Sequence, residues 1–128
     1  MEYNKLVDGI SERAGINRKL FDLDFDQKDG DGIMLRNRQD SNHHYFRKCE
    51  HWENTRERWK STVLFVPSAI IKDFLGILNS IFEENDEETI DLDNIPATFE
   101  YHNDDKSFNV LLGTEGEYYR IELAKKDE

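Results

Sequence analysis

Residues 61–84 read STVLFVPSAIIKDFLGILNSIFEE, and this stretch decides the fold. The run VLFV at 63–66 is apolar at every position, which is typical of a strand buried on both faces. Pro67 cannot donate to a sheet ladder and therefore ends the strand. Ser68 is expected to cap a helix over 68–84. That helix has a broad apolar stripe that requires a sheet to cover it, formed by Ile70, Ile71, Phe74, Leu75, Ile77, Leu78, Ile81 and Phe82.

The residues before this stretch predict a second helix and more strands. Apolar side chains recur at helical spacing over 2–14, and Gly15 can supply the left-handed residue that ends this helix. Alternating apolar and charged residues on either side of the Asp- and Gly-rich turn at 28–32 predict a hairpin. Two further strands are expected before Pro67, so that 20–66 holds four strands.

The residues after the predicted helix indicate an acidic connector and a three-stranded meander. The connector, 85–96, holds many carboxylates and few apolar residues, so we expect it to be solvated. Turn arithmetic over 97–124 places Phe99 opposite Val110 and gathers the apolar side chains on one face. The order α-β-β-β-β-α-β-β-β predicts a single α+β domain, 1–128. It should have an antiparallel sheet of about seven strands and one long amphipathic helix on one sheet face.

Composition and charge exclude several classes of protein. The chain has 128 residues and a net charge of −11, but 37% of its residues are hydrophobic, which is too many for a disordered acidic chain. The single cysteine, Cys49, excludes an intrachain disulfide framework, and the N-terminus lacks the pattern of a signal peptide, so we expect a cytoplasmic location. No apolar stretch approaches the ~20 residues that span a bilayer, which argues against membrane insertion.

The charge is unevenly distributed along the chain. Residues 1–31 carry 5 basic and 8 acidic groups, 32–60 carry 7 and 4, and 61–128 carry 5 and 16. The middle segment is basic and aromatic, and single-stranded nucleic acid binds where cations meet the phosphates and aromatic faces meet the bases. If Val63 and Phe65 face the helix, strand alternation brings basic and aromatic side chains of this segment to the open sheet face. We expect phosphate contacts from Arg36, Arg38, Arg47, Arg58 and Lys60, and base stacking by His44, Tyr45 and Trp52 or Trp59.

Three segments resemble a known family. The segment RKLFDLDFDQKDGDGIMLR at 18–36 resembles the first hairpin of the purine-rich-element-binding (PUR) repeat, and TVLFVPSAIIKDFLGILNSIFEE at 62–84 resembles its last strand and helix. DDKSFNVLLGTEGEYYRIEL at 104–123 looks like the opening hairpin of a second repeat. The pattern is also similar, more loosely, to the single-stranded-DNA-binding domain of a transcriptional coactivator. This resemblance implies non-enzymatic binding of single-stranded DNA or RNA.

The basic segment also has a structural interpretation. Arg36 is placed to pair with Asp22 across the predicted hairpin, and glutamates within the segment can neutralise the remaining cations. Both tryptophans would then belong to the core. His51 reaches the open face only if Trp52 points inward.

The acidity of the chain suggests a second function. Sixteen acidic groups in 61–128 could imitate a phosphate array and bind a basic protein, as small phage inhibitors of nucleic-acid-binding host proteins do. The alternative function is therefore an acidic protein-binding module or nucleic-acid mimic. Unpaired sheet edges make a homodimer a further expectation.

Neither a metal site nor a catalytic site is predicted. Three histidines and Cys49 lie between residues 43 and 51, but their spacing matches no closed four-ligand zinc site. The acidic turn at 24–31 lacks the ligand order of a calcium-binding loop. The chain has no glycine-rich phosphate loop and no nucleophile elbow, so we predict neither a cofactor nor enzymatic activity.

Overall fold

The computed structural model describes residues 1–22, 33–38, 44–54 and 57–126, and for 33–38 it describes the backbone alone. The elements in chain order are α1 (Tyr3–Ala14), the 3₁₀ turn η1 (Arg18–Phe21), β1 (Ile33–Arg38), β2 (Lys48–Asn54), β3 (Trp59–Pro67), the 3₁₀ turn η2 (Ser68–Ile70), α2 (Ile71–Glu84), β4 (Phe99–His102), β5 (Phe108–Glu115) and β6 (Tyr118–Lys126).

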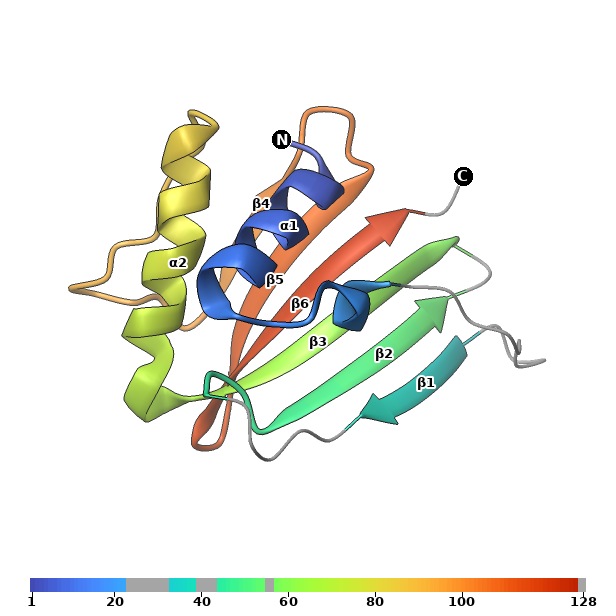
Figure 1. Ribbon diagram of the computed structural model, residues 1–128, viewed down its shortest axis with the longest axis horizontal. Helices are drawn as coiled ribbons and strands as arrows, with labels where there is room; N and C mark the ends of the chain where they lie inside the picture. The colour runs from blue at the N-terminus through green and yellow to red at the C-terminus, as the bar shows by residue number, and fades with distance from the viewer. Residues whose placement is uncertain (23–32, 39–43, 55–56, 127–128) are drawn as a thin grey trace.

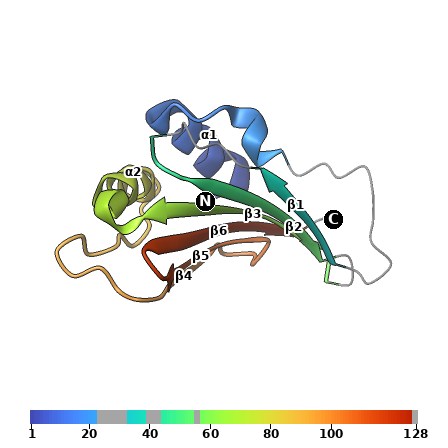
Figure 2. The same ribbon diagram turned by 90° about the horizontal axis from the view of Figure 1, so that it is seen from below.

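The strands form one antiparallel sheet in the order β1-β2-β3-β6-β5-β4. Two three-stranded meanders meet where β3 pairs with β6, and α2 connects one meander to the other (Figure 1). Both helices lie on the same face of the sheet, so the molecule has two layers (Figure 2). In the described part of the chain, no helix lies on the opposite face. We call the helix-covered face the inner face and the opposite one the outer face.

The α+β class is confirmed, but the described residues do not match the expected sheet of about seven strands with one covering helix. The described residues contain six strands, and α1 joins α2 on the inner face. Residues 18–21 form a 3₁₀ turn rather than the start of a strand, because the Asn17 side chain caps the Lys19 N–H and the chain turns there. The rest of that predicted strand, at 23–26, lies outside the described residues. Asp22 accepts a hydrogen bond from Arg18 at 3.3 Å, and the side chain of Arg36, its expected partner, lies outside the described residues.

The helix α1 follows its predicted pattern. Its apolar residues Leu6, Val7 and Ile10 are fully buried, and Gly15 ends the helix in the left-handed conformation at φ 68°. Gly9 has a packing role, since a Cβ at this position would lie 2.8 Å from Cδ1 of Ile81 on α2. The missing side chain therefore lets the two helices approach closely.

The helix α2 ends at Asn85 as expected, but the predicted cap at its start is wrong. Ser68 lies in the 3₁₀ turn before the helix, and its hydroxyl donates to the Glu117 carbonyl at 2.8 Å. The Ser68 N–H donates to the same carbonyl at 2.9 Å. These bonds hold the start of α2 against the turn between β5 and β6. The helix is secured by burial of Phe74, Leu78 and other members of its apolar stripe.

The acidic connector between α2 and β4 is not wholly solvated. The Asn79 side chain accepts from the Ile90 N–H and donates to the Ile90 carbonyl, both at 2.8 Å, so it pairs with the backbone as a neighbouring strand would. Ile90 is only 4% exposed. Glu87 accepts a hydrogen bond from the Tyr101 hydroxyl at 2.9 Å. Burial, with the nearby Glu87, raises the Tyr101 pKa and keeps this hydroxyl protonated.

The C-terminal meander keeps the predicted face but not the predicted register. Phe99 lies opposite Leu112 rather than Val110, a shift of two residues. In the second hairpin, Glu115 pairs with Tyr118, which leaves a two-residue turn. Gly116 in that turn has φ 61°, the left-handed conformation that such turns require. A shift of two preserves side-chain parity, so the apolar residues still share one face.

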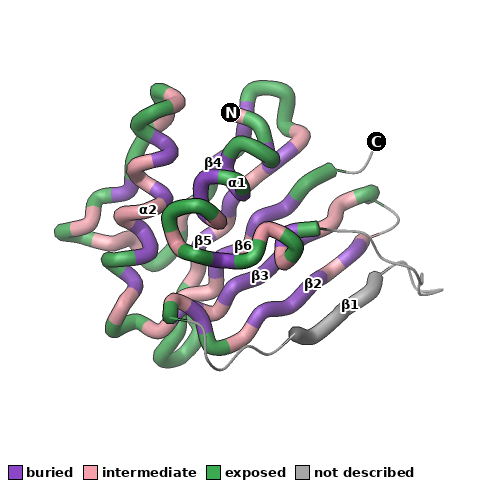
Figure 3. Tube along the Cα trace, viewed as in Figure 1, coloured by how far each residue is buried: buried purple, intermediate pink, exposed green. Residues whose placement is uncertain are grey.

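The core lies between the helices and the inner face, where the central strands are buried over much of their length (Figure 3). Fully buried inner-face residues include Leu64 on β3 and Leu123 on β6, which pack with the rings of Phe74 and Phe108 in one cluster. None of the helices in the described ranges is both long enough and apolar enough to span a bilayer.

Candidate binding surface

The orientation of β3 decides which side chains are available for binding. Leu64 and Val66 belong to the core under the helices, so alternation places Val63 and Phe65 on the outer face. The prediction that Val63 and Phe65 face the helix is therefore wrong. The apolar run alone allows both orientations, but pairing with β6 selects one, because buried Ile121 lies opposite Leu64.

The same parity corrects two expectations for β2. Trp52 points to the outer face, where its indole N–H donates to Glu50 at 3.0 Å. His51 is 2% exposed on the inner face. Its Nε2 lies 2.6 Å from the Leu20 carbonyl oxygen, so the Nε2–H group donates a hydrogen bond to that carbonyl. The imidazole therefore has a structural role. His51 is therefore not on the open face.

The other candidate residues are spread over different parts of the molecule. The His44 ring contacts Tyr45 at 4.7 Å, and the Tyr45 ring contacts Phe74 of α2 at 5.7 Å, so this pair extends the inner layer. Arg58 is exposed in the turn between β2 and β3, at φ 61°. Lys60 is half-buried. It follows Trp59 directly on β3, so its side chain points to the opposite face of the sheet.

The remaining arginines are also separated. Arg36 and Arg38 lie opposite His51 and Cys49 in the backbone register, and their side chains are outside the described residues. Arg47 is exposed just before β2. Of the nine predicted site residues, the structure thus brings Trp52 and Trp59 together and distributes the rest of the described side chains elsewhere.

The two tryptophans line a hollow of about 440 Å³ on the outer face. We call it the tryptophan hollow. It extends across β2, β3, β6 and β5, and both indoles are partly exposed. Other lining residues that bear on its chemistry are Glu53, Glu57, Asn109, Arg120 and Glu122.

Paired charges cover the strands beside the tryptophan hollow. Lys48 contacts Glu50 at 2.6 Å, and Arg120 contacts Glu122 at 3.0 Å. Burial alone would raise the Glu50 pKa, but the hydrogen bonds from Lys48 and Trp52 and the charges of Lys48 and Arg120 outweigh it, so that the pKa lies below its usual value. The cations Lys48 and Arg120 are therefore neutralised within the surface.

A second hollow, of about 430 Å³, lies toward the other end of the outer face. It is lined by Arg47, Lys48, Phe65, Glu115 and Tyr118. The Lys48 ammonium lies 5.3 Å from the centre of the Phe65 ring, within the range of a cation–π contact. Tyr118 is 36% exposed, which makes it the most exposed large apolar side chain of the described residues.

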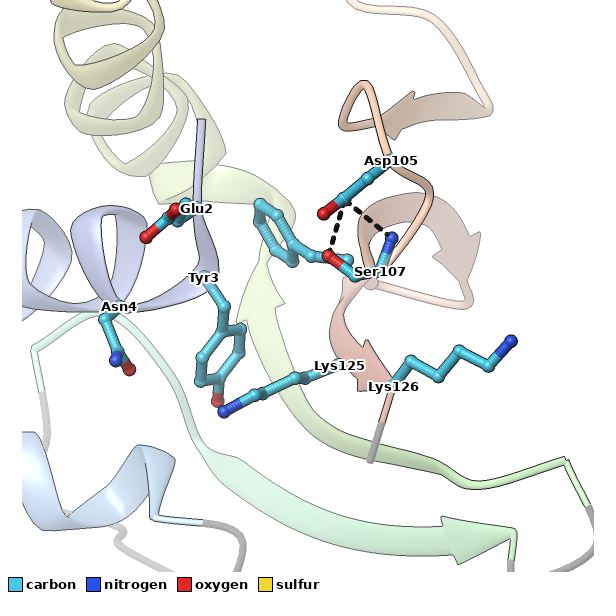
Figure 4. Close-up of a pocket in the computed structure, with 8 residues that line it drawn as sticks. Glu2, Tyr3, Asn4, Asp105, Ser107, Lys125 and Lys126 are labelled. Atoms are coloured by element: carbon cyan, nitrogen blue, oxygen red, sulfur yellow. Dashed lines mark hydrogen bonds between the residues drawn. The ribbon is translucent and has the colours of Figure 1, made fainter. Parts of the chain in front are cut away.

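A third cavity, of about 400 Å³, lies between the start of α1, the start of β5 and the end of β6. Figure 4 shows Lys125 extending over Tyr3, while Lys126 points away from it. Asp105 accepts hydrogen bonds from the Ser107 N–H and hydroxyl. Glu2 and Asp105 line this cavity together with Lys125 and Lys126, so its lining holds equal numbers of acidic and basic residues.

Sequence reasoning missed the part of the outer face that β5 and β6 contribute. Arg120 and Glu122 alternate with buried Ile121, a period-2 signal that marks them as outward-facing. Asn109 carries no comparable signal. Its place beside the tryptophans follows from the pairing of β3 with β6 and β6 with β5, which brings residues about 50 positions apart together.

Within the described ranges, no group of three His, Cys, Asp or Glu side chains is placed to hold a metal ion. His43, one of the histidines considered for zinc, lies outside those ranges. Comparison with protein families, curated proteins and solved structures gives no match. The resemblance to the PUR family therefore stays a prediction from sequence pattern.

Proposed function

We propose that this chain is a non-enzymatic protein-binding domain that docks a basic partner on its outer sheet face. The observation that carries the proposal is the tryptophan hollow: two partly exposed indoles line one depression on a face that neither helix covers. Large aromatic side chains in such positions bury much area on binding and serve as anchors at protein interfaces.

The pairing of charges favours a protein over single-stranded nucleic acid. A polyanion needs several cations that its phosphates can neutralise. On the outer face Lys48 and Arg120 already contact Glu50 and Glu122. The chain as a whole carries a net charge of −11, which repels phosphates at long range.

The same net charge favours a basic partner. Complementary charge increases the association rate and excludes acidic competitors, while the aromatic centre supplies most of the affinity. A second copy of this chain brings the same excess of negative charge, so self-association is the weaker candidate. The proposal keeps the cytoplasmic location, on the basis of the single cysteine, Cys49.

A peptide selection tests the proposal. Peptides selected on the intact domain from a random library should be basic, and Trp59→Ala should weaken their binding by at least about thirty-fold, the loss of a typical interface anchor. Tyr118→Ala is the matched control, because Tyr118 is an exposed aromatic residue that lines the second hollow, at the other end of the outer face. Circular dichroism of each variant confirms that it remains folded.

Three outcomes would overturn the proposal. Selected peptides could bind Trp59→Ala and the parent equally, which places the binding surface elsewhere. Labelled oligothymidylate could bind in a salt-dependent manner and be lost in Trp59→Ala, which assigns the outer face to single-stranded nucleic acid. Concentration-dependent sedimentation abolished by the same variant would assign it to a homodimer.

A further inference from the structure

We infer that the tryptophan hollow receives an arginine side chain of the partner. This inference rests on the proposed function and names the group that the hollow recognises. Three properties of the hollow support it: its indole walls, a hydrogen-bond acceptor in its lining that the fold leaves unused, and its excess of carboxylates.

The walls suit a planar cation. Trp52 extends from β2 and Trp59 from the start of β3, and both line the same depression. The face of an indole attracts a cation, and tryptophan is the strongest of the aromatic side chains in this respect. A guanidinium group is planar and less strongly hydrated than an ammonium group, so it stacks on such a face more readily than lysine does.

The lining contains an unused acceptor. Oδ1 of Asn109 is buried and accepts no hydrogen bond from any residue that the structure describes. A buried acceptor without a donor costs free energy, which a ligand recovers when it supplies an N–H. Arginine has five N–H donors and no acceptor, so it complements this lining.

The charges of the lining also select a cation. Three carboxylate residues line the hollow, Glu53, Glu57 and Glu122, together with a single cation of the same lining, Arg120. Arg120 donates to Oε1 of Glu122, and a carboxylate accepts about four hydrogen bonds, so Glu122 can hold a second guanidinium. A nucleobase would instead bring its phosphate close to these carboxylates.

Titration with N-acetyl-arginine methylamide tests the inference on the intact domain. We expect the indole N–H resonances of both tryptophans to shift in a saturable, salt-sensitive manner. The uncharged citrulline analogue should bind about ten-fold more weakly, because it lacks the charge-assisted hydrogen bonds. The lysine analogue should fall between the two.

Variants show whether the named groups are responsible. Glu122→Gln should weaken arginine binding, whereas Glu100→Gln should not, because Glu100 is exposed on β4 outside the hollow. Asn109→Asp should strengthen arginine binding without strengthening citrulline binding. An affinity gain of this kind cannot result from partial unfolding.

Equal binding of arginine and citrulline, or shifts confined to residues outside the hollow, would overturn the inference. The selected peptides separate its failure from failure of the proposed function. Peptides that require Trp59 but lack arginine would refute the arginine site and leave the docking face intact. Peptides that do not require Trp59 would refute the proposed function itself.

Discussion

The two faces of the sheet differ in how far they bury their large side chains. On the inner face, Leu64 and Leu123 are fully buried under the helices, and His51 donates to a backbone carbonyl. On the outer face, Trp52 and Trp59 are partly exposed beside paired charges. The inner face contributes the main hydrophobic core, whereas the outer face holds aromatic side chains that remain partly exposed.

The largest expected effect is on the inner face. Phe74→Ala removes a fully buried ring of α2, and we expect the free energy of unfolding to fall by about 3–5 kcal/mol, the usual cost of such a cavity. Phe65→Ala on the outer face should cost under about 2 kcal/mol, because that ring is already partly exposed. Urea denaturation measures both. Equal losses would show that the outer face is a second core.

The next effect concerns the edge of the inner layer. Asn79→Ala removes both hydrogen bonds to the Ile90 backbone and leaves two polar groups unpaired, so we expect a loss of about 1–3 kcal/mol. Hydrogen exchange of the Ile90 amide should become faster. Asn85→Ala, which removes one bond to the Ile81 carbonyl, is the control. Unchanged exchange at Ile90 would mean that the connector is held by its apolar contacts alone.

A smaller, pH-dependent effect is expected on the outer face. The Glu50 pKa is lowered in the fold, so its carboxylate contributes stability above the ordinary pKa of 4.5, and this contribution is lost as the pH falls through the lowered value. Glu50→Gln should therefore cost about 1 kcal/mol at neutral pH and progressively less in acid. Urea midpoints measured across the acid range check this. A difference that is independent of pH would contradict the paired-charge account of this face.

The smallest effect is expected where the helical layer meets solvent. Arg13 of α1 contacts Glu84 of α2 at 2.7 Å, but the Glu84 side chain is 62% exposed. Such a pair contributes about 0.2–1 kcal/mol, so Arg13→Ala should change stability only slightly and the difference should shrink in high salt. A larger loss, insensitive to salt, would mean that the Arg13 stem is part of the helix packing.

The elements with strong periodicity could be predicted from the sequence. The apolar stripes of α1 and α2 have one orientation that buries them, and the C-terminal meander has one apolar face. The run at 63–66 is apolar on both sides, so it could not show which side faces the helices. That choice is made by β6, whose alternation is unambiguous.

The candidate site was harder to predict because neighbours in sequence are not neighbours on a sheet. Adjacent residues on a strand point to opposite faces, so His51 lies on the inner face and Trp52 on the outer face. Tyr45 precedes β2, and its ring contacts Phe74 of α2. In contrast, Asn109 and Arg120 reach the tryptophans only through strand pairing. Of the described side chains that the basic segment contributes to the predicted site, Trp52 and Trp59 share one hollow, and part of the charge around them comes from β6.

The most direct test of the account is a nuclear magnetic resonance titration of the intact domain with a selected basic peptide. The account predicts that the indole N–H resonances of Trp52 and Trp59 and the backbone amide resonances of β6 all shift. Their shifts should follow the same saturation curve as the peptide concentration increases. Shifts centred on α1 and α2, with both indoles unchanged, would contradict it.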